Sequence, residues 1–505
     1  MTSRRRIYLL ALILTAVAGL WIAPLGRSLW LDETLTYWAV KDGLVSAVER
    51  ASRTQGQSHL YYVLAWGAVV LGGAREVVLR LPSVIAMAGA AFLLYQLGTR
   101  LVDQEFGFLA AIVLVSFRNV VSAAVGARPY ALALFLVVAA VLALVRWLDR
   151  GRAVDGVSYV LAASLTVYAH FLFGAMFLVH AVIAFERKRV GSPVSWKALG
   201  LAAGACGLLV MPLVPQFLSL MGRTRSLTWL EDLSVPTLLG RVAWGLLVFA
   251  AALLVGVLLA RASGRVRFRP PASSDLRLPV VLIAWIALPP LALLAVTLLT
   301  PAKLFVSRYY LGAAVGFALL VAWGIRGLQS SVARAILAGA IVLVTVVGSQ
   351  TMRRSRGGED WRGAARAARQ AAPGDRTPVL MRAGLIESDR PDWLSDPAWA
   401  DYLNAPVSFY PINRNTIPLP YRVDASSQAY LERLASGTLE HSDAFLLVTR
   451  DDPREYREWL EARLAPAGFA AQLVGRYGSV WVVKFTRGGS PASRATFGPA
   501  ARVES

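Results

Sequence analysis

Long apolar segments recur along this chain of 505 residues, and loops rich in arginine and lysine separate many of them. A helix needs about 20 apolar residues to cross a bilayer, and several of these segments reach that length. The composition agrees, because 56% of the residues are hydrophobic, 16% are charged and the mean hydropathy is +0.54. Ordinary soluble globular proteins do not have such a composition. The sequence therefore predicts an all-α polytopic membrane protein.

The distribution of basic residues predicts the direction of each span, because cytoplasmic loops carry an excess of arginine and lysine. Arg4, Arg5 and Arg6 precede the first span, at about 7–26, which places the N-terminus in the cytoplasm. No clean small-residue cleavage site follows, so this span is an anchor rather than a removed signal peptide. We expect eleven spans, with the C-terminus outside. Those after the first lie at about 81–99, at 107–125, before the loop 146–152, in a hairpin over 157–185, and at 197–214, 242–260, 278–299, 309–325 and 334–350.

The apolar block at about 157–185 is predicted to be a helical hairpin. Basic loops flank it on both sides, so a single span would place one of them on the wrong side of the membrane. Two legs of about 14 residues are shorter than a full span, which indicates that the hairpin is embedded in protein or lines a thinned region. Its turn is expected near Ala169, His170 and Phe171.

The net charge of +21 would suggest a nucleic-acid partner in a soluble protein. Here much of the arginine and lysine lies in loops between apolar segments, which indicates how the spans are oriented in the membrane. We therefore expect the membrane, and no nucleic acid, as a partner. The single cysteine, Cys206, excludes an intrachain disulfide and is expected to be a small buried hydrophobic residue.

The apolar runs end near residue 350. This change predicts a transmembrane module over 1–350, a small extracytoplasmic α/β domain over 351–487 and a disordered tail over 488–505. Within the domain, we expect helices at 361–370 and 453–464, strands at 379–381, 444–449, 470–474 and 480–485, and a hairpin turn at 475–478.

An acidic pair, Asp32 and Glu33, follows the first span and is therefore expected at the extracytoplasmic face. Charged groups next to lipid are costly, so they tend to mark function when they face a protected cavity. The predicted topology gathers cations on the same side, where few are expected. Such cations need an anionic partner, either a lipid phosphate or the two carboxylates. The polar and aromatic residues on this side are His59, Tyr61, Tyr62, Arg80, Arg128, Tyr130, His170, Lys303, Arg308 and Tyr309.

Several short motifs occur in an order that resembles a known family. They are Trp30-Leu31-Asp32-Glu33, Leu60-Tyr61-Tyr62-Val63-Leu64, Leu79-Arg80-Leu81-Pro82-Ser83, Ala127-Arg128-Pro129-Tyr130 and Ser307-Arg308-Tyr309-Tyr310. In motif order and topology, residues 7–350 are similar to the polytopic GT-C glycosyltransferases that use polyprenyl-phosphate sugars. The resemblance is to the bacterial branch related to protein O-mannosyltransferases and aminoarabinose transferases. The stretch Gln57-Ser58-His59 departs from the family pattern, which often has Pro or a charged residue there.

The resemblance implies inverting transfer of a hexosyl or pentosyl group from a polyprenyl monophosphate to a hydroxyl of a lipid, glycan or protein acceptor. It implies no nucleotide and leaves a divalent cation open. Asp32 is the expected general base, because a carboxylate can remove the acceptor proton as the new bond forms. Glu33 would orient the acceptor, hold a metal ion or fix an arginine. Fixed cations would stabilise the departing phosphate. The candidates are Arg80, Arg128, Lys303 and Arg308.

Each candidate residue also has a structural alternative. Acids favour helix N-termini, so Asp32 and Glu33 would then cap a helix that begins near Thr34. Arginines at span ends often extend along the helix toward the interface, histidines at helix ends are often structural, and tyrosines form interfacial belts. The apolar segment 60–71 is predicted to be an interfacial helix, and the alternative is a further span.

Two other functions stay open on the sequence. A transporter or flippase of lipid-linked sugars would use the same basic groove without transfer chemistry, and a membrane scaffold would use the C-terminal domain to bind proteins. Transporters usually place ionisable groups at mid-membrane, whereas here they cluster at the ends of spans. We expect a multi-pass protein of the inner (plasma) membrane.

Overall fold

The computed structural model describes residue 11 and residues 18–53, 59–221, 277–300, 304–355 and 358–488. The chain forms two compact units. The first contains residues 1–25 and 43–351, and the second contains residues 26–42 and 352–505. The second unit is therefore discontinuous in sequence, because the segment that carries Asp32 and Glu33 folds with the C-terminal residues.

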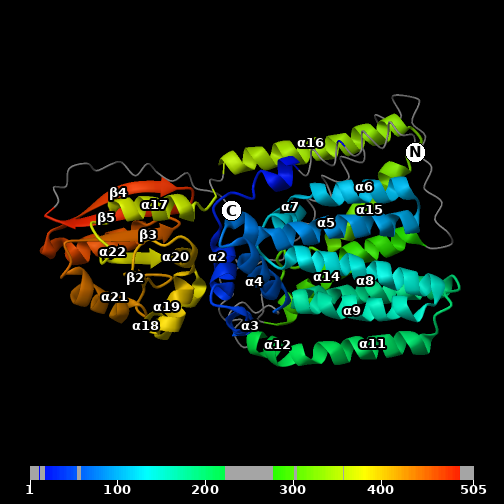
Figure 1. Cartoon of the computed structure of the whole chain (residues 1–505), viewed down its shortest axis with the longest axis horizontal. Coiled ribbons are helices and arrows are strands. Elements are labelled where there is room, and N and C mark those ends of the chain that lie inside the picture. The colour runs from blue at the N-terminus through cyan, green and yellow to red at the C-terminus, as the bar shows by residue number, and fades with distance from the viewer. Residues whose placement is uncertain are drawn as a thin grey trace. The chain divides into compact units, whose positions relative to one another are not determined.

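The first unit is a bundle of helices (Figure 1). Its described helices are η1 (Ala18–Ile22), α3 (Leu44–Arg53), α4 (Leu60–Gly72), α5 (Glu76–Leu101), α6 (Gln104–Ser116), α7 (Arg118–Ala124), α8 (Tyr130–Arg150), α9 (Ala153–Ala169), η2 (Phe171–Ala175), α10 (Met176–Arg189), α11 (Trp196–Val210), η3 (Met211–Leu213), α12 (Val214–Met221), α14 (Leu278–Leu299), α15 (Ala313–Arg326) and α16 (Ser331–Ser355). Within the described residues, four helical stretches are long and apolar enough to cross a membrane: α5, α8, Trp196–Ser219 and α14. This is the architecture of a multi-pass membrane protein.

Helix α8 forms the centre of the bundle. Its sequence from Tyr130 to Val145 contains no charged residue. A helix that is apolar on all sides is stable when it is buried, and 78% of the most apolar window of α8 is buried. Helices α5, α9 and α10 pack against it.

Most predicted spans that fall within the described residues coincide with helices. Helix α14 has the predicted bounds, and α11, η3 and α12 together cover the span predicted at 197–214. In the predicted hairpin, α9 has 17 residues and α10 has 14, and α9 ends at Ala169, directly before His170, where the turn is expected. The segment predicted as an interfacial helix is α4. The span predicted at 242–260 lies outside the described residues.

The span predicted at 107–125 is not one continuous helix. It consists of α6 and α7, which meet at an angle of 76°. The break falls at Phe117, whose backbone is extended, with φ −69° and ψ 132°. Next to it, Ser116 Oγ donates to the Ile112 carbonyl at 2.8 Å. Such side-chain bonds compete with the backbone ladder and bend helices.

Two helix starts also differ from the prediction. Helix α5 begins at Glu76 rather than near residue 81, so Arg80 lies inside the helix and not before it. Helix α15 begins at Ala313 rather than near residue 309, because turns occupy residues 307–312.

The second unit is an α/β domain around a five-stranded sheet with strand order β2-β1-β3-β5-β4 (Figure 1). Strand β1 (Val379–Arg382) pairs in parallel with β2 (Thr416–Pro418) and β3 (Ala444–Arg450). Strand β5 (Val480–Arg487) is antiparallel to β3 and β4 (Phe469–Tyr477). The described helices of this unit are α2 (Leu31–Val40), α17 (Trp361–Ala371), η5 (Ile386–Asp389), α18 (Pro391–Ser395), α19 (Pro397–Leu403), α20 (Ala405–Phe409), α21 (Gln428–Leu434), η6 (Ala435–Leu439), α22 (Arg454–Leu464) and η7 (Ala465–Ala467).

The core of this domain follows the alternation of side chains along β3. Phe445 and Leu447 pack with Phe485 of β5 and with apolar side chains of α21 and α22. The rings of Phe445 and Phe485 are stacked at 4.6 Å. Because successive side chains point to opposite faces, Leu446 and Val448 face the other side of the sheet. Helix α17 packs on β3, β4 and β5.

The predicted strands and the helices at 361–370 and 453–464 are present, whereas the predicted hairpin turn at 475–478 is wrong. Strand β4 continues through Tyr477, and the turn is the two residues Gly478 and Ser479. Gly478 supplies the positive φ, +65°, that so short a hairpin favours. Gly475 instead lies at a shift in the β4 and β5 register.

Candidate functional site

Two arginines, a histidine and two tyrosines gather in the first unit, and we call them the arginine–histidine cluster. Its members are Arg128, Tyr130, His170, Arg308 and Tyr309. The ring of His170 lies 5.3 Å from that of Tyr130 and 5.6 Å from that of Tyr309, between centroids. The guanidinium of Arg308 is 5.3 Å from the Tyr309 ring. The charges of Arg128 and Arg308 both act on the His170 ring.

Helix ends bring these residues together. Arg128 lies in the turn before α8, where Pro129, with φ −67°, is preorganised to start the helix. His170 ends α9 with an extended backbone, and its Nδ1 accepts from the Leu172 amide at 3.4 Å. Tyr309 lies in the turns before α15. His170 is 4% exposed, and its Nε2 has no hydrogen-bond partner among the described residues.

Hydrogen bonds connect Arg128 to the two tyrosines of α4. Arg128 Nη1 donates to the Tyr62 hydroxyl at 3.5 Å. Ser83 Oγ donates to the Arg128 carbonyl at 3.2 Å and lies 2.8 Å from the Tyr61 hydroxyl. Both tyrosines are fully buried. They therefore pack inside the unit rather than in a lipid-exposed belt.

Arg80 is occupied by the backbone of the chain. Its side chain is buried, and Nη1 donates to the carbonyls of Pro24 at 3.3 Å and Leu25 at 2.7 Å. This geometry favours a structural role, in which Arg80 satisfies carbonyls beyond the end of η1.

Replacing Arg80 by methionine is expected to lower the thermal unfolding midpoint of the purified protein in detergent. Hydrogen bonds with a charged donor contribute about 1.5–3 kcal/mol each, and two carbonyls would lose theirs. The control is Arg75→Met, because Arg75 is exposed and directly precedes α5, the helix that contains Arg80. Equal midpoints for the two variants would contradict the structural role.

Two further candidates from the sequence are His59 and Lys303. His59 Nδ1 lies 2.9 Å from Ser52 Oγ, at the junction of α3 and α4. Lys303 lies outside the described residues.

The acidic pair belongs to the second unit, at the first turn of α2. This helix begins at Leu31, three residues earlier than predicted. Glu33 is fully buried, and its Oε2 accepts from the Trp30 amide at 3.1 Å. Glu33 thus serves as a helix cap, as in the structural alternative. Asp32 is half-buried.

A carboxylate that the sequence did not single out, Glu359, also lies at the start of α2. Its Oε2 accepts from the Leu31 amide at 2.7 Å and from Trp361 Nε1 at 2.8 Å. Its Oε1 pairs with Arg450 Nε at 2.9 Å. The sequence offered one sign of this residue. Glu359 stands in the run Gly357-Gly358-Glu359-Asp360, shortly after the last predicted span.

Among the described residues, no group of three or more His, Cys, Asp or Glu side chains is arranged to hold a metal ion. Near Asp32, the carboxylate of Glu359 is already engaged by Arg450, Trp361 and the Leu31 amide.

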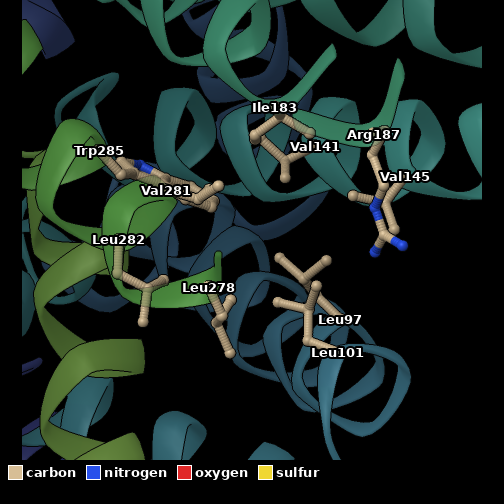
Figure 2. Close-up of a pocket in the computed structure, with 10 residues that line it drawn as sticks. All are labelled: Leu97, Leu101, Val141, Val145, Ile183, Arg187, Leu278, Val281, Leu282 and Trp285. Carbon is tan, nitrogen blue, oxygen red and sulfur yellow. The ribbon is translucent and has the colours of Figure 1, made fainter. Parts of the chain in front are cut away.

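The first unit contains a small cavity and a large one. Figure 2 shows the small one, about 20 Å³, which Arg187 and apolar residues such as Trp285 line. It has room for about one water molecule. The large one, about 750 Å³, lies along α9, α10 and α11 and has the size of a ligand site. Its described lining residues are Leu144, Tyr159, Phe177, His180, Ala181, Ala184, Trp196, Leu199, Gly200, Ala203, Cys206, Gly207, Val210, Met211 and Val214.

The chain is similar to known glycosyltransferases. Residues 58–214 match the family model described as dolichyl-phosphate-mannose-protein mannosyltransferase. No curated protein sequence matches the chain significantly. The crystal structure of ArnT from Cupriavidus metallidurans in the apo state has 11% identity and a TM-score of 0.56, over 95% of this chain and 98% of that chain. The structure of ArnT from the same organism bound to undecaprenyl phosphate has 12% identity and a TM-score of 0.57, over 96% and 98%.

At this level of identity, the structural similarity establishes a shared fold. The fold extends over nearly the whole chain, and the family match covers the segment that contains α4 to α11. The chain thus resembles the mannosyltransferase family over residues 58–214 and shares the fold of ArnT over nearly its whole length.

Proposed function

We propose that this protein transfers a sugar from a polyprenyl monophosphate to an acceptor hydroxyl on the extracytoplasmic side of the plasma membrane. The observation that carries the proposal is the arginine–histidine cluster. Two guanidinium groups act on one buried imidazole there. Like charges in a medium of low dielectric constant repel each other, and a bound phosphate relieves that repulsion. Arginine also matches a phosphate in a bidentate manner.

Arg128 and Arg308 then stabilise the lipid phosphate as it leaves. Negative charge develops on the leaving oxygen when the glycosidic bond breaks, and fixed cations lower the energy of that state. Tyr62 holds the Arg128 guanidinium, and Tyr309 lies under that of Arg308. The family match, which covers Arg128 and His170, and the ligand of the ArnT structure, undecaprenyl phosphate, both support this class of donor.

Asp32 acts as the general base. It is half-buried and lies in the first turn of α2, where the helix dipole favours a carboxylate. It removes the proton of the acceptor hydroxyl as the oxygen attacks the anomeric carbon, and the configuration inverts. The acceptor is a lipid, a glycan or a protein, and no nucleotide takes part. The C-terminal domain lies on the same extracytoplasmic side.

A transfer assay with the full chain in nanodiscs tests this function. The protein receives a polyprenyl-phosphate sugar with a labelled sugar, together with lipid, glycan or peptide acceptor fractions. We expect label in one acceptor fraction, with release of an equal amount of polyprenyl monophosphate. Movement of the lipid-linked sugar across proteoliposomes without transfer would indicate a flippase, and neither transfer nor movement would contradict the proposal.

A further inference from the structure

We propose that Glu359 is a positioning residue, which fixes the first turn of α2 and thereby aims the Asp32 carboxylate at the acceptor. This inference rests on the proposed function, in which Asp32 is the base. Both residues belong to the second unit, so the contacts between them lie within that unit.

The contacts of Glu359 reach the backbone directly next to Asp32. The Leu31 amide, which donates to Glu359 at 2.7 Å, is one of the N-terminal amides of α2 that have no partner inside the helix. The preceding amide, that of Trp30, donates to Glu33. Two buried carboxylates thus hold the two amides that precede Asp32, and a hydrogen bond to an ionised acceptor is stronger than one between neutral groups.

Glu359 is itself held firmly. Its side chain is 8% exposed, the Trp361 indole donates to it at 2.8 Å, and Arg450 at the end of β3 pairs with it at 2.9 Å. Burial raises the pKa of Glu359, and the charge of Asp32 acts in the same direction, whereas Arg450, the indole and the Leu31 amide favour the ionised form. The two acids therefore interact through their charges as well as through the backbone.

Contacts on both sides of the first turn also anchor α2 in the same domain. The Leu29 amide donates to the Tyr410 hydroxyl at 2.8 Å, and Trp38 Nε1 donates to Asp401 at 2.8 Å. With these anchors in place, losing the Glu359 contact would loosen the first turn without detaching the helix. A misplacement of about 1 Å at a reacting group can cost about 100-fold in rate.

The test compares two replacements of Glu359 in the full chain. Glu359→Met removes the acceptor for the Leu31 amide, and we expect kcat to fall about 10- to 100-fold while KM for the lipid donor stays unchanged. Glu359→Gln keeps an oxygen that can accept the same bond, so it should restore most of kcat. The matched control is Asp452→Asn, which also removes a carboxylate from an arginine pair, with Arg454, but at the surface. It should retain the wild-type kcat.

A folding defect is separated from a positioning defect by a double variant. Glu359→Met with Arg450→Met leaves no unpaired buried charge, so it should unfold near the wild-type temperature while keeping the low kcat. Wild-type turnover by folded Glu359→Met, or by the double variant, would overturn the positioning role. If Asp32→Asn also turned over normally, the proposed base would fail, whereas an inactive Asp32→Asn beside a fully active Glu359→Met would refute only the inference on Glu359.

Discussion

Replacement of Asp32 by asparagine is expected to lower kcat by about 100- to 10,000-fold, the usual contribution of a general base. Asparagine has nearly the same shape, but it cannot take a proton from the acceptor hydroxyl. Because the donor-phosphate ligands proposed here belong to the first unit, binding of a polyprenyl monophosphate should not change. Single-turnover transfer and equilibrium lipid binding, measured in nanodiscs, check both statements.

Two further replacements serve as controls for Asp32→Asn. Asp375 is an exposed acid of the same unit, so Asp375→Asn should keep full activity. Glu33→Gln retains an oxygen for the Trp30 amide and should therefore affect kcat far less than Asp32→Asn. Near-normal transfer by Asp32→Asn would remove Asp32 from the mechanism, and a larger loss in Glu33→Gln would transfer the role of base to Glu33.

Replacement of Arg128 by methionine should lower kcat/KM for the lipid donor by about 100- to 1000-fold, the range seen when a group that stabilises developing charge is removed. The affinity for polyprenyl monophosphate should fall as well. Arg128→Lys should recover only part of the loss, because an ammonium keeps the charge but not the planar fork of donors. Lipid binding and single-turnover rates of the variants measure these effects.

The control for Arg128 is Arg118→Met. Arg118 is exposed at the start of α7, ten residues away in sequence, so its loss removes the same charge without touching the cluster. Unfolding midpoints of both variants show whether loss of the Tyr62 contact weakens the fold. Wild-type affinity and rate in a well-folded Arg128→Met would contradict the phosphate role.

Much of the helical architecture follows from hydrophobic runs. The bounds of α14 were predicted to the residue, because a long apolar segment in a bilayer is stable as a helix, which satisfies its own backbone hydrogen bonds. The bend between α6 and α7 was missed, because no glycine or proline stands at Phe117 or beside it to indicate a break in the helix. Strand β2 was also missed, because three residues that include proline carry almost no strand signal.

For the candidate site, the sequence did not predict which groups the side chains contact. Arg128, His170 and Arg308 were expected on one side of the membrane, and the structure brings them together. No sequence pattern indicated that Arg80 would bind two backbone carbonyls or that His59 would contact Ser52. Glu359 was missed because it contacts a backbone amide 328 residues away. Pairings of that range leave no local pattern.

The discontinuity of the second unit affects when the enzyme can become active during its synthesis. Helix α2 is made early, but the residues that hold it, Glu359, Asp401 and Tyr410, emerge more than 300 residues later. Contacts of such long sequence separation form late, because closing a long loop costs entropy first. We therefore expect the first turn of α2, with the proposed base Asp32, to become ordered only after the C-terminal residues have been made. The proposed transfer activity would then begin only when that domain has folded around the start of α2.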